Sequence, residues 1–312
     1  MPRFMLPILI KTLPFFALIG LGYAAGRTRF FTPEATAWLT KFVFYFALSA
    51  MLFGFASNLS LAEIWDGRFV LAYLLGSGVV YILAMGVAFW RGAPTEEAAI
   101  EAQCAVIGNT GFLGVPMLVV LMGPQAAGPI LMVLAIDLIV FSTIITLIMT
   151  GARQGRMRFG ALKPLGAGLL KNPMIVSMAL GLAWSATGFA VPVPINEFMS
   201  LLGGAATPGA LFAIGASLAG KSAERVAVAG WLSFCKLVLH PAAVAFAALY
   251  LLKVDPEPAG VMIAAAALPV AGNVYMLAQH FGVAPQRVSA SILISTTVSI
   301  LTITIVMALV MG

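Results

Sequence analysis

The stretch that decides the fold reads Val106-Ile-Gly-Asn-Thr-Gly-Phe-Leu-Gly-Val-Pro116, in the middle of an apolar segment over residues 98–122. A segment of this length and composition predicts a membrane-spanning helix. Gly111, Gly114 and Pro116 nevertheless interrupt helices, and here they stand at mid-span. A break frees main-chain N–H and C=O groups at membrane depth, which is costly unless they line a cavity or meet a partner. The stretch therefore predicts a broken helix inside a membrane protein.

A second interrupted segment matches the first. Residues 259–281 contain Val270-Ala-Gly-Asn273, which repeats the pattern Val-x-Gly-Asn, and Pro269 and Gly272 supply the helix-breaking residues. The chain contains ten apolar segments, five in each half, and each of these two segments is the fourth in its half. Paired Gly/Pro-interrupted segments in corresponding positions indicate the binding site of a transporter.

The composition supports a membrane protein throughout. Of 312 residues, 62% are apolar and 9% are charged, and the mean hydropathy is +1.05, whereas soluble domains carry about 25% charged residues. This excludes a cytosolic enzyme, a secreted binding module and a disordered protein. Ten apolar segments predict an all-α polytopic protein with ten transmembrane helices. The segments are 4–26, 34–56, 68–90, 98–122, 127–150, 172–190, 196–219, 227–252, 259–281 and 288–311.

The chain divides at a basic stretch into two halves of five segments. We expect a first repeat over 1–151, a basic loop over 152–171 and a second repeat over 172–312. A repeat with an odd number of spans returns upside down, so the two halves predict inverted repeats with helices 4 and 9 broken and crossed.

Basic residues predict the orientation. Loops after the odd-numbered segments hold eleven Lys and Arg residues, and the other loops and both termini hold three. By the positive-inside rule the odd-numbered loops are cytoplasmic and both termini are extracytoplasmic, which fits a bacterial inner membrane. The eleven are Arg27, Arg29, Arg91, Arg153, Arg156, Arg158, Lys163, Lys171, Lys221, Arg225 and Arg287.

Two broken helices that cross near the midplane bring two half-helix N-termini together. Each N-terminus carries free N–H donors and partial positive charge, which suits an anion. An Asn beside each break can hold a carboxylate or stabilise the opposite break. The alternative is that Gly and Pro are simply common in membrane helices and that each Asn satisfies nearby main chain. The candidate substrate-binding residues are Gly108, Asn109, Thr110, Gly111, Gly272, Asn273 and Val274, the main chain of Thr110, Gly111 and Val274 supplying donors.

These motifs resemble a known family. Gly108-Asn-Thr-Gly-Phe-Leu-Gly-Val-Pro116 is similar to the fourth-helix signature of the auxin efflux carrier family, and Gly272-Asn-Val-Tyr275 is similar to its ninth-helix partner. The family includes plant auxin transporters and bacterial carriers of malonate, malate and similar carboxylates. The resemblance implies the fold of bile-acid symporters and sodium–proton antiporters, with a scaffold domain, a transport domain and an elevator motion. It also implies that Asn109 and Asn273 contact the substrate, and it leaves a homodimer possible by analogy with the plant carriers.

Ionisable residues inside the predicted spans are functional candidates by default. Asp137 lies near mid-depth, where it is either a proton-coupling site, a partner of Lys11 or Lys236, or a structural buried acid. Lys236 and His240 are spaced i, i+4 and share one helix face, so they attract an anion, accept a proton or form a polar seam. Glu101 either marks a helix N-terminus or releases a proton.

Other chemistry has no signature in the sequence. No phosphate-binding loop, HExxH metal motif or GxSxG nucleophile elbow is present, so we expect no enzyme, no metal and no cofactor. The net charge of +6 sits in short loops, which indicates membrane orientation rather than nucleic-acid binding. The sequence therefore predicts a secondary carrier for small organic anions in contact with lipid, driven by protons or by membrane potential. The alternatives are a sodium-coupled organic-anion symporter and a membrane enzyme or sensor without transport.

Overall fold

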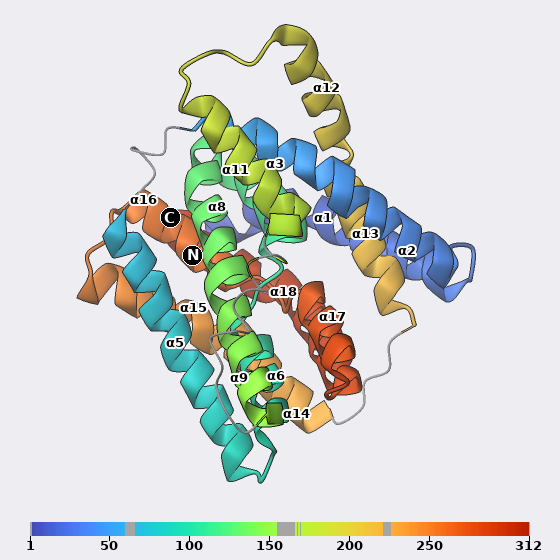
Figure 1. Cartoon of the computed structure of the whole chain (residues 1–312), viewed down its shortest axis with the longest axis vertical. Coiled ribbons are helices and arrows are strands. Elements are labelled where there is room, and N and C mark those ends of the chain that lie inside the picture. Colours follow the sequence, from blue (N-terminus) through green and yellow to red (C-terminus); the bar gives the residue numbers. More distant parts are fainter. Residues whose placement is uncertain are drawn as a thin grey trace.

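The computed structural model describes residues 2–59, 66–154, 166, 168, 170–220 and 226–311, and helices occupy all ten predicted segments in these residues (Figure 1). No β-strand occurs in this part of the chain. Most of the predicted loop 152–171 lies outside the described residues, as do Arg156, Arg158, Lys163, Lys221 and Arg225. The first half contains α1 (Pro2–Arg27), α2 (Pro33–Phe42), η1 (Val43–Ala47), α3 (Leu48–Ala56), α5 (Gly67–Trp90), α6 (Thr95–Val106), η2 (Thr110–Gly114), α7 (Val115–Met122), η3 (Pro124–Ala126), α8 (Ala127–Ile136), η4 (Asp137–Phe141) and α9 (Ser142–Gln154). The second half contains α11 (Pro173–Ser185), α12 (Val193–Gly204), α13 (Ala206–Leu218), α14 (Val226–Phe234), η6 (Cys235–Leu239), α15 (His240–Ala245), η7 (Phe246–Leu251), α16 (Pro256–Ala266), α17 (Gly272–Phe281) and α18 (Pro285–Met311).

Seven helical stretches among the described residues are long and apolar enough to cross a membrane. The other three predicted segments are shorter for identifiable reasons. The fourth and ninth segments are interrupted near their middle, as the Gly and Pro residues predict. The sixth, α11, begins after the Asn172 cap and ends at Ser185. The all-helical class is therefore confirmed, while the inverted-repeat relation between the halves stays a prediction.

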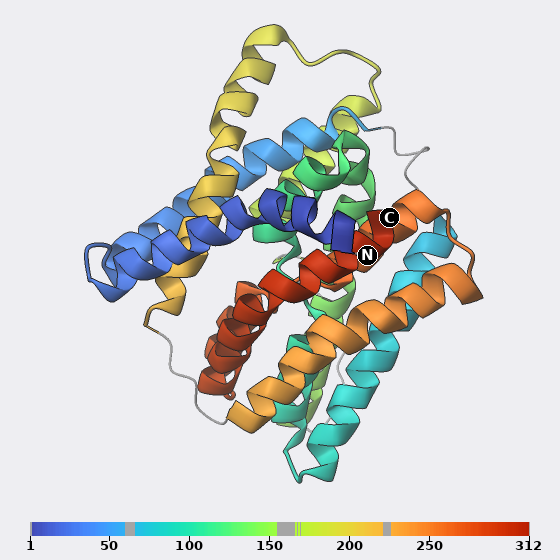
Figure 2. The same ribbon diagram turned by 180° about the vertical axis from the view of Figure 1, so that it is seen from behind.

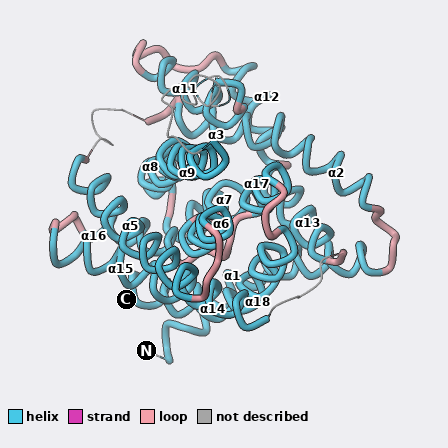
Figure 3. The backbone as a smooth tube through the Cα atoms, turned by 60° about the horizontal axis from the view of Figure 1, so that its bottom comes forward, coloured by secondary structure: helices cyan, strands magenta, loops and turns pink. Residues whose placement is uncertain are grey.

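The helices form two packing groups that both draw on the two halves of the chain. One group consists of α1, α2, α3, α11, α12 and α13. The other contains α5 to α9 and α14 to α18 and holds both broken helices. Figure 2 shows α1 lying along the boundary, where it packs on α13 of its own group and on α18 of the other. Figure 3 shows α6 and α7 at the centre of the molecule, enclosed by the surrounding helices.

Small residues allow the closest helix pair of the first group to touch through its main chain. A Cβ on Gly22 of α1 would lie 2.1 Å from the carbonyl oxygen of Phe212, and one on Gly215 of α13 would lie 1.9 Å from that of Ile19. No larger side chain fits at either place without separating the helices. Gly26 of α1 makes a third such approach, since a Cβ there would lie 2.8 Å from the Ala216 carbonyl oxygen. The close packing of α1 on α13 therefore depends on these three glycines.

Three polar residues of the second group lie in π-helical turns. Thr110 begins η2, Asp137 begins η4 and Lys236 lies in η6. A π-turn widens the helix and shifts the direction of the side chains that follow, and such turns are frequent at functional sites. The π-turn of η6 has a local cause, because Pro241 has no N–H to donate to the main-chain carbonyl one turn before it.

Candidate functional site

The two interruptions meet at the centre of the second packing group. Helix α6 ends at Val106 and α16 ends at Ala266, and the segments that follow run past each other as an antiparallel bridge between Gly108 and Val270. The Asn109 N–H donates to the Pro269 carbonyl over 2.8 Å, and the Ala271 N–H donates to the Ile107 carbonyl over 3.1 Å. These bonds satisfy main-chain groups that the breaks free. We call residues 107–109 and 267–271 the crossover.

Some of the predicted break residues lie within the crossover, and others lie in the helix that follows it. Pro269 lies in the crossover itself. Gly114 ends η2 and Pro116 is in the first turn of α7, so both lie in the helix that resumes after the break. The chain leaves the helix earlier than these residues indicate, at Ile107, whose φ of −77° and ψ of 110° are extended.

Both resumed helices begin without a side-chain cap. The described residues offer no hydrogen-bond acceptor to the N–H groups of Gly111 and Phe112 at the start of η2, or to those of Gly272 and Asn273 at the start of α17. The first N–H groups of a helix need an outside partner. The crossover thus presents two pairs of free donors, each at the positive end of a helix dipole.

Of the three predicted main-chain donors, one has this property. The Gly111 N–H is free, whereas the Thr110 N–H donates to the Gly108 carbonyl over 2.8 Å and the Val274 N–H donates to the Ala271 carbonyl over 3.2 Å. The free donors therefore lie one residue later than predicted at the start of η2, and at the start of α17 they are the two residues before the predicted Val274.

The two asparagines differ in their surroundings. Asn109 is 8% exposed, and its side chain has no hydrogen-bond partner among the described residues. Asn273 is exposed, and a Cβ on the neighbouring Gly272 would have no atom within 4 Å, so open space lies beside the start of α17. The Asn109 amide can therefore bind water or a ligand without first giving up a protein partner.

Asp137 lies beside the start of η2. It is 5% exposed, and it accepts hydrogen bonds from the Tyr73 hydroxyl at 2.9 Å and from the Thr110 hydroxyl at 3.3 Å. Of the two lysines that the sequence leaves as partners, Lys236 acts on it electrostatically, while Lys11 is exposed on α1. Asp137 therefore joins α5 and η4 to the fourth-helix break.

Lys236 and His240 reach the other break. Both side chains are fully buried, and the Lys236 ammonium lies 3.1 Å from His240 Nδ1, as the i, i+4 spacing predicts. The ammonium also donates to the carbonyl of Ala266, the last residue of α16. A cation there satisfies a free carbonyl at the negative end of a half-helix. A Cβ on Gly108 would lie 3.2 Å from Lys236 Nζ, so Gly108 leaves room for this side chain.

Glu101 is the centre of a separate ionic cluster. Its side chain is fully buried and forms ion pairs with Arg91, which follows α5, and with Arg287 of α18. Arg287 also pairs with Glu97 at 3.0 Å, and on the same side Glu96 pairs with Arg153 of α9 at 2.8 Å. These contacts join α6 to three neighbouring elements. The helix N-terminus predicted at Glu101 lies earlier, because α6 begins at Thr95 and its first turn contains Glu96 and Glu97. Glu101 instead holds two arginines inside the protein, and proton release by Glu101 stays a prediction.

Three polar residues of the site do not follow from the reasoning on sequence. Tyr73 and Ser77 of α5 are buried and reach Asp137 and His240. Ser295 accepts a hydrogen bond from the Val270 N–H at 3.1 Å and so supports the crossover. The sequence does carry a signal for the first two, because Tyr73, Ser77 and Tyr81 repeat every four residues and so share one face of an apolar helix.

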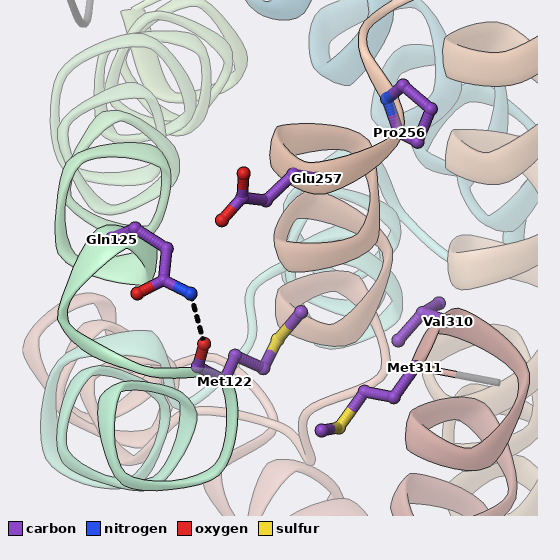
Figure 4. A pocket seen from close by; sticks show the side chains of 6 residues that line it. All are labelled: Met122, Gln125, Pro256, Glu257, Val310 and Met311. Atoms are coloured by element: carbon purple, nitrogen blue, oxygen red, sulfur yellow. Dashed lines mark hydrogen bonds between the residues drawn. The ribbon is translucent and has the colours of Figure 1, made fainter.

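A pocket lies elsewhere, between the ends of three helices (Figure 4). It has a volume of about 380 Å³ and is wide open. Its lining comes from the end of α7, from η3, from the start of α16 and from the end of α18. The Gln125 amide in this lining donates to the Met122 carbonyl over 2.8 Å. None of the predicted site residues lines it, so it is separate from the crossover. The lining residues are Met122, Gln125, Pro256, Glu257, Val310 and Met311.

Known proteins are similar to this chain over nearly its whole length. A family model described as "Membrane transport protein" matches residues 7–307. A Rhizobium meliloti (strain 1021) protein named "Putative malonate transporter" is 32% identical over 296 residues, covering 94% of this chain and 92% of that protein. The Escherichia coli (strain K12) "Uncharacterized transporter YfdV" is 25% identical over 91% of each chain. "Auxin efflux carrier component 8" of Arabidopsis thaliana is 22% identical over 94% of each chain. The chain is therefore a multi-pass membrane protein that belongs to the membrane transport protein family, the family of the auxin efflux carriers.

Proposed function

We propose that the protein carries small organic anions, with carboxylates such as malonate or malate as substrates, and that the anion binds at the crossover. One observation carries this proposal: two helices start at the crossover with four N–H groups that have no acceptor in the described residues. A carboxylate supplies acceptor oxygens and a negative charge, and it would satisfy donors from both helices at once.

The two asparagines complete the proposed site. Asn109 is 8% exposed, its side chain has no hydrogen-bond partner among the described residues, and its amide would donate to one carboxylate oxygen. Asn273 stands at the open start of α17 and would reach the same anion or its second carboxylate. Gly272 leaves open space beside this site, since a Cβ there would have no atom within 4 Å. The name of the Rhizobium meliloti relative, with its malonate, supports the same substrate class.

The two packing groups suit movement of one against the other. We propose an elevator motion in which the group that holds the crossover moves along the group formed by α1, α2, α3, α11, α12 and α13. The crossover would then open to each side of the membrane in turn. We place the protein in a bacterial inner membrane with both termini outside, because the basic residues lie in the odd-numbered loops.

The test is uptake of radiolabelled malonate and malate by proteoliposomes, with binding measured separately as thermal stabilisation of the purified protein by each acid. Removal of an amide that binds a charged group costs about 1.5–3 kcal/mol, so Asn109→Ala and Asn273→Ala should each weaken binding roughly tenfold to a hundredfold. Asn196→Ala, which removes an exposed amide on α12, is the control and should bind normally. Normal binding and uptake by both crossover variants would refute the proposed site.

A further inference from the structure

The buried polar side chains around the crossover form a chain from Lys236 to Asp137. Lys236 Nζ lies 3.1 Å from His240 Nδ1, and His240 Nε2 lies 2.8 Å from the Ser77 hydroxyl. Ser77 follows Tyr73 by one turn of α5, so the two side chains lie on the same face of the helix. The Tyr73 hydroxyl donates to Asp137 Oδ1 over 2.9 Å. Three groups that can each accept one proton and release another thus lie in order between an ammonium and a carboxylate.

Each end of this chain is attached to one of the two breaks. The Asp137 carboxyl also accepts from the Thr110 hydroxyl, at the start of η2. The Lys236 ammonium donates to the Ala266 carbonyl, at the end of α16. Every member of the chain is at most 5% exposed. The chain therefore links the protonation of Asp137 to the place where we propose that the anion binds, and it is shielded from solvent.

The tautomer of His240 follows from its two neighbours. A charged Lys236 has donors and no acceptor, so Nδ1 must accept and Nε2 must carry the hydrogen that points to Ser77. The Ser77 hydrogen is then free to point towards Tyr73, and Tyr73 donates to Asp137. All hydrogens point from Lys236 towards Asp137, which is the order that one proton displacement along the chain requires.

Repulsion between a bound anion and the ionised Asp137 is the reason that a proton would move along the chain to Asp137. The titratable groups that act on Asp137 are Tyr73 of α5 and Lys236 of η6, and Lys236 in turn acts on His240 of α15. A carboxylate bound at the start of η2 would stand near the ionised Asp137, and like charges in a buried site repel strongly. Protonation of Asp137 removes this repulsion, so anion binding and proton binding favour each other reciprocally.

We propose that the carrier takes up one proton with each anion, and that the Lys236–His240–Ser77–Tyr73 chain delivers this proton to Asp137. A proton leaves Lys236 for His240 Nδ1, the Nε2 proton passes to Ser77, the Ser77 proton passes to Tyr73, and the Tyr73 proton passes to Asp137 Oδ1. The neutral Lys236 amine, which is shielded in this conformation, then gains a proton from water that reaches it when the carrier opens to one side. Each donor loses one proton and gains one, and the net uptake is one proton. This inference rests on the proposed function.

The experiment compares two modes of malonate flux in proteoliposomes. In net uptake driven by an inward proton gradient, the carrier must take up a proton from water on one side and release it on the other. In malonate–malonate exchange, the carrier can cross the membrane in both directions with an anion and the same proton bound, so the proton need not leave. Tyr73→Phe keeps the ring and removes the hydroxyl. It should lower gradient-driven uptake at least about tenfold relative to exchange, since the chain then lacks one link. Asp137→Asn should lose the response to the proton gradient altogether.

Tyr81→Phe is the matched control. Tyr81 lies two turns after Tyr73 on the same buried face of α5, and its hydroxyl has no hydrogen-bond partner in the part of the chain that the structure describes. This variant should behave as wild type in both modes. Gradient-driven uptake that survives in Tyr73→Phe at the level of the control would overturn the proposal, as would wild-type flux that follows voltage alone.

A second measurement separates this inference from the proposed function. Infrared difference spectra of the purified protein between acidic and alkaline pH should contain the band of a buried protonated carboxyl group. That band should be absent in Asp137→Asn, shifted in Tyr73→Phe and unchanged in Tyr81→Phe. Absence of any dicarboxylate exchange by wild type would refute the proposed function, and a pH-dependent spectrum without a contribution from Asp137 would refute the relay.

Discussion

Glu101 allows a quantitative test of the ionic cluster on α6. Glu101→Gln removes a charge that is fully buried and paired with both Arg91 and Arg287. The Arg287 side chain is 7% exposed and keeps only Glu97, at 3.0 Å, as a charged partner. Breaking a buried ion pair from one side leaves a desolvated charge and costs about 3–5 kcal/mol. The equilibrium constant for unfolding should therefore rise roughly a hundredfold or more.

Glu96→Gln is the comparison on the same helix. Glu96 pairs with Arg153 at 2.8 Å, but the two side chains are 31% and 47% exposed. Solvent-exposed ion pairs contribute about 0.2–1 kcal/mol. The two variants thus make the same chemical change on one helix, and their expected costs differ several-fold because of burial.

The assay is reversible unfolding of the purified protein in mixed micelles, followed by tryptophan fluorescence as denaturing detergent is added. Equal free energies of unfolding for the two variants would refute the argument from burial. If Glu101 instead released a proton during transport, Glu101→Gln would change the pH dependence of malonate flux and leave stability close to that of Glu96→Gln.

Three further predictions concern packing and the crossover. Gly22→Ala places a Cβ 2.1 Å from the Phe212 carbonyl oxygen, whereas Gly20→Ala meets nothing within 4 Å, so the first should cost about 1–3 kcal/mol and the second should be neutral or stabilising in the same unfolding assay. Ser295→Ala leaves the Val270 N–H without its acceptor and should lower the free energy of unfolding by about 1–3 kcal/mol. Ser299→Ala is the control and should lower it less, because the Ser299 hydroxyl donates to the Thr296 carbonyl of its own helix. Equal losses of stability would refute a role of Ser295 in the crossover. Gly111→Ala brings a Cβ to 2.5 Å from the Met174 methyl group and should slow malonate flux, and Met174→Ala should restore it in the double variant.

Helix positions were predictable from the sequence because hydrophobic length is the dominant signal in lipid. All ten predicted segments contain helices. The pairing of the two breaks was predictable from the repeated Val-x-Gly-Asn pattern, since both halves place it in the same segment. The residue at which each helix stops was not predictable, because Gly and Pro can be accommodated after a break as well as in it. Gly114 and Pro116 were predicted at the break, but both lie in the helix that resumes after it.

The polar chain around Asp137 was predictable only in part. The i, i+4 spacing of Lys236 and His240 predicts their contact, because an α-helix places such residues on one face. Their positions relative to Asp137, Tyr73 and Ser77 depend on the packing of α5, η4 and η6, and on π-helical turns that shift side-chain directions. Neither the packing nor the turns leave a periodic signal in the sequence. The sequence alone therefore leaves both Lys11 and Lys236 as possible partners of Asp137, and in the structure Lys236 is the lysine that acts on it.

The crossover is held by main chain, and this bears on how such a carrier can change its cargo over evolutionary time. The bonds from Asn109 N–H to Pro269 and from Ala271 N–H to Ile107 use no side-chain atoms. Substitution of most side chains along these two segments would leave the bonds in place, so the main-chain frame that holds two helix ends together is insensitive to mutation. Selection for a larger, smaller or more apolar anion can then act on the side chains around the frame without first having to rebuild it.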